Sequence, residues 1–328
     1  MKALHKIRFL LFVLWLRLRH WQRVIVLERV SGLGDVINGT CIDRALKQKY
    51  PKHLILYATA KPYAGLLRHC LGVDAVYGIP PGAEIPKEKA AWLVDRHYEP
   101  HSSDERGQGG VKQHVIHVFL KDCDLPVENW QPRISISEMD RHTVADEFGF
   151  RPDETIIAIH TGRTWPVKEL SGERWQEIVD GLQKLQPCRI LHFCSPGRDG
   201  APVHKLRGVQ VMEPDLSPIK TAIILSQCRL VIGIDSGLLH MAGAVETPLI
   251  GIFGPTDPRY FLPLKSLAHG VSHAVPCSFC HHEKIIKHWH TGCPYDIRCM
   301  KGVSANQVLD AAKNVLFDGA KNLPPAIE

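Results

Sequence analysis

The chain has 328 residues, of which 45% are hydrophobic and 23% are charged, and its formal net charge is +6 with histidine counted as neutral. This length suffices for two α/β domains of about 150 residues each, and the composition excludes a largely disordered chain. The modest positive charge suits an anionic ligand or a membrane surface, and no stretch alternates Lys and Arg with aromatic residues, so we expect no nucleic-acid binding.

The first 23 residues form a basic segment around a short apolar run. Residues 9–16 are all apolar, Lys and Arg stand on both sides of them, and no acidic residue occurs before Glu28. A run of eight residues is too short to cross a bilayer, which takes about 20. Basic residues follow the run where a signal peptide would carry small residues for cleavage, so a signal peptide is not expected.

Two interpretations of this basic segment remain. It forms either a helix that lies on an anionic membrane surface, with Trp15 and Trp21 at the level of the lipid headgroups, or an ordinary first helix that packs on the protein. On the first interpretation, deleting residues 1–19 leaves a folded protein that has a weaker affinity for anionic vesicles.

Strand-like and helix-like stretches alternate along the rest of the chain. Predicted strands cover residues 24–27, 54–57, 91–94, 155–160, 189–193, 230–234 and 248–252. Predicted helices cover residues 36–49, 62–70, 171–186, 237–245 and 304–317, with one more that contains residues 111–121 and another within residues 136–152. This alternation predicts an α/β fold in which parallel sheets are covered by helices on both faces.

The helix and link within residues 136–152 divide the alternating pattern into two parts. We therefore expect two Rossmann-like domains that face each other, one of residues 24–150 and one of residues 151–328. Ligands of such folds bind at the carboxyl ends of the strands, so we expect the site in a cleft that both domains line.

A glycine turn follows the first predicted strand, with the sequence Gly32-Leu33-Gly34-Asp35. Glycines let the backbone turn tightly and approach a ligand, and the start of the next helix favours negative charge. A dinucleotide site is not expected, because Ile37 replaces the third glycine and the second strand ends without a carboxylate. Asp35 is then either a helix cap or a base for an acceptor hydroxyl.

A second polar turn, Asp235-Ser236-Gly237, follows the strand of residues 230–234, with His240 one helical turn further on. Backbone N–H groups are unpaired where a helix starts, so a diphosphate can dock at Ser236 and Gly237. His240 would add a donor to the same phosphates, and Asp235 would orient the loop or a sugar hydroxyl. The plainer alternative is a helix cap with a packed histidine.

A third polar group follows the first strand of the second domain and consists of His160, Thr161, Arg163 and Lys168. A nucleotide diphosphate that leaves its sugar gains negative charge, which a lysine or arginine stabilises without a metal ion. Taken singly, each of these residues is more often an ordinary solvated or packed side chain.

Together these turns resemble glycosyltransferase family 9, the ADP-heptose:lipopolysaccharide heptosyltransferases. Residues 34–46, GDVINGTCIDRAL, resemble the opening motif of that family, although Cys41 stands where the family usually has proline. Residues 232–242, IGIDSGLLHMA, and residues 251–258, GIFGPTDP, resemble its donor-binding motif. Lys168 stands seven residues before Trp175, which is similar to the spacing of the family's Lys…Trp element.

This resemblance implies a GT-B fold, that is, two facing Rossmann-like domains, and an inverting transfer that requires no metal ion. Asp35 would be the general base on an acceptor-side loop that contains Gly32 and Gly34. The donor site implied by the resemblance and by the polar turns contains His160, Thr161, Lys168, Asp199, Asp235, Ser236, Gly237 and His240.

The resemblance also implies the partners. They are a nucleotide-sugar donor, with ADP-heptose favoured, and an acidic glycolipid acceptor of the lipopolysaccharide core or a related surface glycan. The protein would be cytoplasmic and would make peripheral contact with an anionic membrane at its inner face.

Four of the ten cysteines cluster in residues 277–299, with the spacing Cys277-x2-Cys280-x12-Cys293-x5-Cys299. Four such ligands in a short loop indicate a structural zinc site, although zinc sites more often have x2 in the second half as well. Free thiols or disulfides are the alternatives. The other six cysteines show no pairing pattern, which fits a reducing cytoplasm.

Two other functions remain open beside the heptosyltransferase. One is a transferase of the same fold that uses a different nucleotide sugar, and the other is a nucleotide-sugar-binding protein without turnover. Replacing Asp35 by Asn distinguishes the two kinds of protein. In an enzyme the substitution abolishes transfer and spares donor binding, whereas a binding protein has no turnover to lose.

Overall fold

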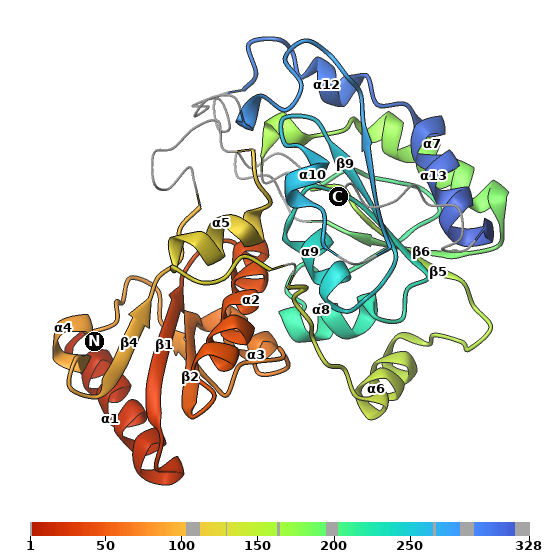
Figure 1. Cartoon of the computed structure of the whole chain (residues 1–328). Helices are drawn as coiled ribbons and strands as arrows, with labels where there is room; N and C mark the ends of the chain where they lie inside the picture. Colours follow the sequence, from red (N-terminus) through yellow and green to blue (C-terminus); the bar gives the residue numbers. More distant parts are fainter. Residues whose placement is uncertain are drawn as a thin grey trace. The chain divides into compact units, whose positions relative to one another are not determined.

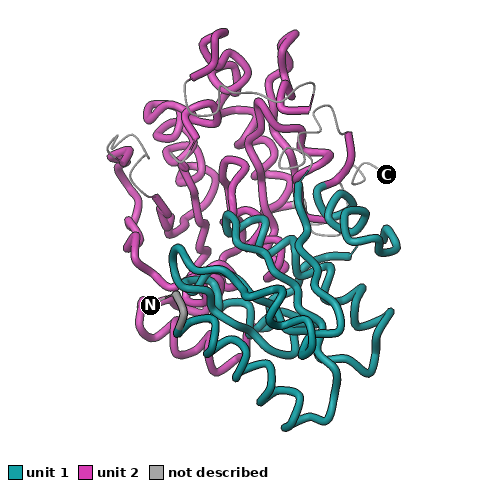
Figure 2. The backbone as a smooth tube through the Cα atoms, turned by 90° about the vertical axis from the view of Figure 1, so that its left-hand side faces the viewer, with its two compact units in different colours: residues 1–102, 115–135 teal, residues 103–114, 136–328 magenta. Residues whose placement is uncertain are grey.

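The computed structural model describes residues 2–102, 112–128, 130–162, 165–194, 203–264, 267–282 and 292–318. The chain divides into two compact units, with residues 1–102 and 115–135 in unit 1 and residues 103–114 and 136–328 in unit 2 (Figure 2). Each unit is built around one parallel sheet, so the predicted α/β class with two parallel sheets is confirmed.

Unit 1 has a four-stranded sheet of strand order β3-β2-β1-β4 (Figure 1). Its strands are β1 (Arg23–Arg29), β2 (His53–Ala60), β3 (Ala75–Ile79) and β4 (Val94–Tyr98). Its helices are α1 (Lys2–His20), α2 (Leu33–Lys49), α3 (Ala64–Leu67), α4 (Lys87–Ala90) and α5 (Val115–Asp122). Strands β1 and β2 are buried along almost their whole length because α1 packs on one face of the sheet and α2 packs on the other.

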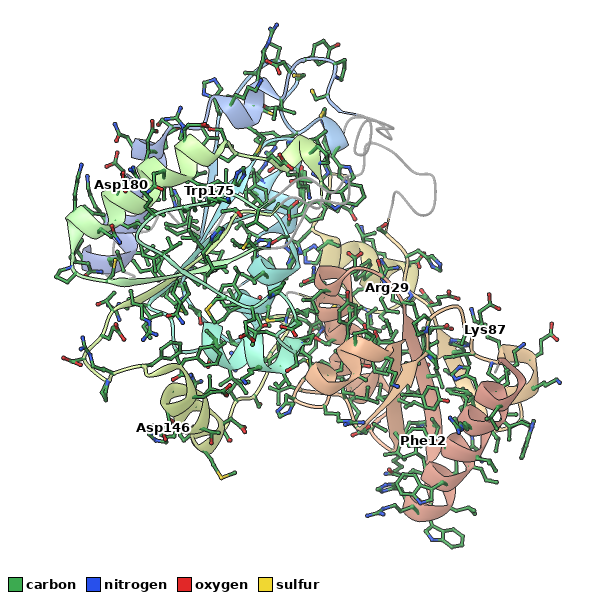
Figure 3. All side chains as sticks on the ribbon, turned by 180° about the vertical axis from the view of Figure 1, so that it is seen from behind. Phe12, Arg29, Lys87, Asp146, Trp175 and Asp180 are labelled. Carbon is green, nitrogen blue, oxygen red and sulfur yellow. The ribbon has the colours of Figure 1, made fainter. Side chains whose placement is uncertain are left out.

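Unit 2 has a six-stranded parallel sheet of strand order β10-β9-β8-β5-β6-β7. Its strands are β5 (Ile156–His160), β6 (Arg189–Phe193), β7 (Gln210–Val211), β8 (Leu230–Ile234), β9 (Leu249–Phe253) and β10 (Ala268–Ser272). Its helices are α6 (Glu138–Phe148), α7 (Gly172–Leu185), α8 (Pro218–Leu225), α9 (Gly237–Ala244), α10 (Pro258–Phe261), α12 (Arg298–Lys301) and α13 (Ala305–Lys313). The core forms where α7 and α13, side by side, meet the sheet, and it includes the fully buried Trp175 (Figure 3).

Local signals in the sequence account for several of these elements. Ser171 caps α7 as predicted, since its side chain accepts a hydrogen bond from the backbone N–H of Arg174. Strand β4 begins at Val94, where the predicted strand of residues 91–94 ends, because residues 91–93 form the turn that follows α4. Strands β3 and β10 were not predicted, because both are short edge strands interrupted by glycine.

Helix α1 settles how the basic first segment folds. Phe9, Val13 and Leu16 are at most 3% exposed and belong to the same core cluster as Val24 and Leu56. Deletion of residues 1–19 would uncover one face of the sheet, so the structure now leads us to expect that it destabilises unit 1. No helix in the described part of the chain combines the length and apolar character that a membrane crossing needs.

Asp43 is a carboxylic acid in the core of unit 1. It lies on α2, its exposed fraction is 0%, and neither side-chain oxygen has a hydrogen-bond partner among the residues that the structure describes. Burial, and next the charge of Asp74, raise its pKa well above the usual value. The folded state therefore keeps a proton that the unfolded chain releases above about pH 4.

Asp43→Asn is expected to stabilise the protein at neutral and alkaline pH. In the native chain, stability falls as the pH rises above the unfolded-state pKa toward the raised folded-state pKa, whereas an amide has no proton to release. Unfolding measured between about pH 4 and pH 8 should give the variant a growing advantage, on the order of 1–3 kcal/mol at the upper end. Asp310→Asn, at a position whose side chain is 69% exposed, is the control. Parallel pH profiles for Asp43→Asn and the native chain would contradict the prediction.

Candidate functional site

The glycine turn of unit 1 joins the end of β1 to the start of α2. Gly32 precedes the helix, with φ −60° and ψ 155°, and makes no side-chain cap, while Gly34 and Asp35 lie in the first helical turn. This turn stands at the carboxyl end of a central strand, as the sequence predicts.

Two side chains orient Asp35. The Ser31 hydroxyl donates a hydrogen bond to Oδ2 of Asp35 over 2.7 Å, and Nη2 of Arg29 lies 3.2 Å from the same oxygen. Arg29 is itself fixed, because it is buried, donates to the carbonyl of Pro100 over 2.9 Å and lies over the ring of Phe119 (Figure 3). The carboxylate is thus held by side chains rather than used as a helix cap, and the Asp35 side chain keeps 36% of its surface accessible.

A buried ion pair forms the centre of the group in unit 2. Nζ of Lys168 donates to Oδ2 of Asp235 over 2.6 Å, and the hydroxyl of Thr256 donates to the same oxygen over 2.8 Å. The three side chains come from a 3-10 turn after β5, from the end of β8 and from the loop after β9. Three segments that follow neighbouring strands therefore meet at the carboxyl edge of the sheet.

The surroundings of Asp235 stabilise its charged form. Burial alone would raise its pKa, but the charges of Lys168 and His240 and the hydrogen bonds from Lys168 and Thr256 outweigh burial and hold the pKa below its usual value. The site consequently holds a paired negative and positive charge that are both nearly inaccessible to water.

Two histidines beside this pair are held neutral. Nδ1 of His160 lies 3.0 Å from the hydroxyl of Ser236, and Nε2 of His192 lies 3.0 Å from the hydroxyl of Thr161. Burial, with a smaller contribution from a neighbouring histidine, lowers the pKa of each to about 4. At neutral pH both rings are therefore uncharged hydrogen-bonding groups.

The N-terminus of α9 opens next to these side chains. Ser236 precedes the helix but makes no side-chain cap, since its hydroxyl contacts His160 instead, and the helix begins at Gly237. The first N–H groups of a helix have no acceptor within the helix and favour an anion. The turn after β5 packs closely against the end of β8 beside this helix. Gly162 in that turn has φ +79°, and a Cβ there would lie 2.0 Å from Cδ1 of Ile234.

The structure brings most of the predicted donor-site residues together in unit 2. These are His160, Thr161, Lys168, Asp235, Ser236, Gly237 and His240. Asp199 and Arg163 lie outside the described residues. Gly32, Gly34 and Asp35 form the turn of unit 1.

Four contributing residues were not assigned a role from sequence, namely Arg29, Ser31, His192 and Thr256. Arg29 ends β1 just before the glycine turn, Ser31 stands at the start of that turn, and His192 lies inside a strand without any motif around it. Thr256 belongs to the GIFGPTDP stretch, so the resemblance of that stretch was the one signal that could have pointed to it.

The four clustered cysteines are free thiols. Burial raises the pKa of Cys280, and the charges of Cys277 and Cys293 raise it further. Burial and the other three sulfurs raise the pKa of Cys299 to about 11. No set of three or more His, Cys, Asp or Glu within the described ranges is arranged as a metal site. The structural zinc stays a prediction.

Residues 74–290 match the family model of glycosyltransferase family 9 (heptosyltransferase). Lipopolysaccharide heptosyltransferase 2 of Salmonella typhimurium is 25% identical over 301 residues, which cover 73% of this chain and 84% of that protein. The structure of the E. coli ADP-heptose lipopolysaccharide heptosyltransferase II matches with a TM-score of 0.66 at 16% identity, over 90% of this chain and 99% of that one.

The dodecameric iron-containing heptosyltransferase TibC of enterotoxigenic E. coli, in complex with ADP-D-β-D-heptose, also matches. Its TM-score is 0.67 at 15% identity, over 90% of this chain and 77% of that one. These structural likenesses confirm the predicted fold, which is GT-B-like with two parallel sheets.

Proposed function

We propose that this chain, which belongs to glycosyltransferase family 9 and is therefore a glycosyltransferase, transfers heptose from ADP-heptose to an acidic glycolipid. That acceptor is a lipopolysaccharide core or a related surface glycan. The names of the similar heptosyltransferases and the ADP-heptose bound to TibC support this donor and acceptor. On this proposal the reaction inverts the anomeric configuration, needs no cofactor and takes place at the inner, cytoplasmic face of an anionic membrane.

The observation that carries the proposal is the buried pair of Lys168 and Asp235 beside the start of α9. A diphosphate at the N–H groups of Ser236 and Gly237 gains negative charge when the sugar leaves. The positive charge of Lys168 offsets the charge of Asp235, so the carboxylate does not repel the diphosphate. His240, one turn into the helix, adds a further polar contact.

The transfer itself requires a base on the acceptor hydroxyl. The carboxylate of Asp35 accepts the hydroxyl proton, and the oxygen forms a bond to the anomeric carbon of heptose. The bond from that carbon to the diphosphate oxygen breaks, and its electron pair leaves with ADP. Arg29 and Ser31 hold the carboxylate in one orientation for this step.

A thermal-shift comparison of ADP, UDP, GDP and dTDP tests the donor. A ligand that binds the folded state raises the Tm by mass action, so ADP at about 100 times its Kd should add about 2.7 kcal/mol of stability. A larger shift with UDP would instead favour a transferase that uses another nucleotide sugar. A shift with ADP but no transfer of heptose to a heptose-deficient core glycolipid would favour the binding protein without turnover.

We also propose that Cys277, Cys280, Cys293 and Cys299 hold a structural metal ion, zinc in the first instance. Their spacing in sequence and their partial burial support this, because a bound cation would replace the thiol protons and offset the charges that raise the pKa of Cys280 and Cys299. The ion would fix the loop of unit 2 that contains the cysteines and would take no part in the transfer.

Elemental analysis of protein purified without chelator checks the metal ion. About one zinc per chain is expected, and Cys280→Ser with Cys299→Ser should abolish it and lower the Tm. Cys188→Ser, at a half-buried cysteine outside the cluster, is the control. Since TibC is iron-containing, iron is measured alongside zinc, and a metal-free protein with four titratable thiols would contradict the proposal.

A further inference from the structure

Helix α1 carries apolar side chains on two opposite faces. Phe9, Val13 and Leu16 are buried against the sheet of unit 1. A second set repeats at helical spacing on the opposite side, and its members are 48% to 61% exposed. This outer face consists of Leu4, Ile7, Leu11, Trp15 and Leu18.

The outer face continues beyond the end of α1. Trp21 follows the helix directly, with φ 53°, and is 90% exposed. The helix runs beside the sheet (Figure 1), and Phe12, which is labelled in Figure 3, stacks on Trp15 with ring centroids 5.8 Å apart. The apolar stripe therefore extends along the whole helix, about 28 Å for 19 residues.

Exposed basic side chains border one side of this outer face. At 3.6 residues per turn, Arg8 and Arg19 lie on that border. Lys6 and Arg17 lie nearer the packed face, and Arg17 donates a hydrogen bond to the carbonyl of Leu93 over 2.8 Å. The guanidinium of Arg19 lies 5.2 Å from the ring centroid of Trp15, which keeps the charge beside the apolar stripe. Helix α1 contains no acidic residue. Acidic side chains lie near its packed face, since Lys6 shares a hollow with Glu84 and Glu88 and Phe9 shares one with Asp95.

We propose that the outer face of α1 is a docking surface for an anionic membrane, with the helix parallel to the bilayer surface. An exposed apolar stripe with a basic border matches acyl chains below it and anionic headgroups beside it. A second copy of the chain fits less well, because two such faces would bring like charges together. The basic border formed by Arg8 and Arg19 thus favours the anionic membrane as the occupant.

The N-terminal end of α1 lies at the same end of the unit 1 sheet as the glycine turn. Only Trp21 and Gln22 separate α1 from β1, so the chain reverses and the N-terminal end of α1 lies beside the carboxyl end of β1. Lys6 and Glu28 accordingly line one hollow. Because Asp35 follows that end of β1, the glycine turn lies at the same end of the unit 1 sheet as the N-terminal end of α1.

Vesicle binding of the full-length chain tests the proposal. The probe is phosphatidylcholine vesicles with about one third phosphatidylglycerol, compared with phosphatidylcholine alone. The triple variant Ile7→Ser, Leu11→Ser, Leu18→Ser changes exposed side chains only, so we expect a native Tm and binding weaker by about 30-fold or more. Leu71→Ser, at a side chain that is 42% exposed and precedes the Gly72 turn packed against α2, is the matched control and should bind as the native chain does.

Two further measurements make the outcome decisive. Arg8→Gln with Arg19→Gln should weaken binding to the anionic vesicles and leave the residual affinity for neutral vesicles unchanged. Transfer to a water-soluble acceptor fragment should be unaffected in the triple variant, so failure of docking is distinguishable from failure of the proposed reaction. Vesicle binding by the triple variant as strong as that of the native chain would overturn the proposal. So would a native chain that is a dimer in solution and a triple variant that is a monomer, because the outer face would then be an interface between two copies.

Discussion

Asp35→Asn is expected to lower the rate of transfer by about 10²–10⁴-fold, the range that a positioned general base contributes. An amide has the shape of the carboxylate and can still contact Ser31, but it cannot accept the proton of the acceptor hydroxyl. Donor binding should change little, because the predicted donor residues are all in unit 2. The measurement is kcat for heptose transfer together with the Kd for ADP.

Ser31→Ala is the matched control for this experiment. It removes one hydrogen bond to Asp35 but leaves the carboxylate and its contact with Arg29, so a loss of transfer of about tenfold or less is expected. If Asp35→Asn transfers heptose as fast as Ser31→Ala does, another group serves as the base. Both variants should retain a Tm near that of the native chain.

Lys168→Met is expected to destabilise the protein by about 3–5 kcal/mol, because it leaves the charge of Asp235 buried and unpaired. ADP should also bind more weakly, since the uncompensated carboxylate repels the diphosphate. Thermal or denaturant unfolding and a titration with ADP measure the two effects.

The double variant Lys168→Met, Asp235→Asn tests this explanation. It removes both charges, so much of the stability should return, and much of the affinity for ADP should return with it because no carboxylate then repels the diphosphate. Lys220→Met is the control in the same unit, because the pair of Lys220 with Glu147 is partly exposed and should contribute about 1 kcal/mol or less. Equal stability losses for Lys168→Met and Lys220→Met would contradict the role given to the buried pair.

The central strands and their following helices could be predicted because their sequences carry a strong local pattern. The runs at β1, β5 and β8 are short, apolar and rich in β-branched residues, which is typical of strands covered on both faces. Helix α1 could not be resolved in the same way. Its buried and exposed faces are both apolar, so periodicity does not distinguish packing on the protein from contact with a membrane.

The site was predictable as separate motifs but not as contacts. Lys168 and Asp235 are 67 positions apart, and only the fold brings their atoms to 2.6 Å. The resemblance to family 9 pointed to both residues, whereas nothing in the sequence assigns Arg29 to Asp35. A single arginine at the end of an apolar strand has the same local pattern whether it contacts solvent or fixes a carboxylate.

The close packing of Gly39 against β2 helps to set the position of Asp35. The hydroxyl of Tyr57, a fully buried side chain on β2, donates to the carbonyl of Val36 over 2.9 Å, and a Cβ at position 39 would lie 2.4 Å from that hydroxyl. Even a methyl group there would push α2 away from β2. The first turn of α2, which contains Asp35, would move with it. An alanine at position 39, which favours helices in isolation, would thus shift the carboxylate of Asp35 through the core of unit 1 and without any direct contact to it.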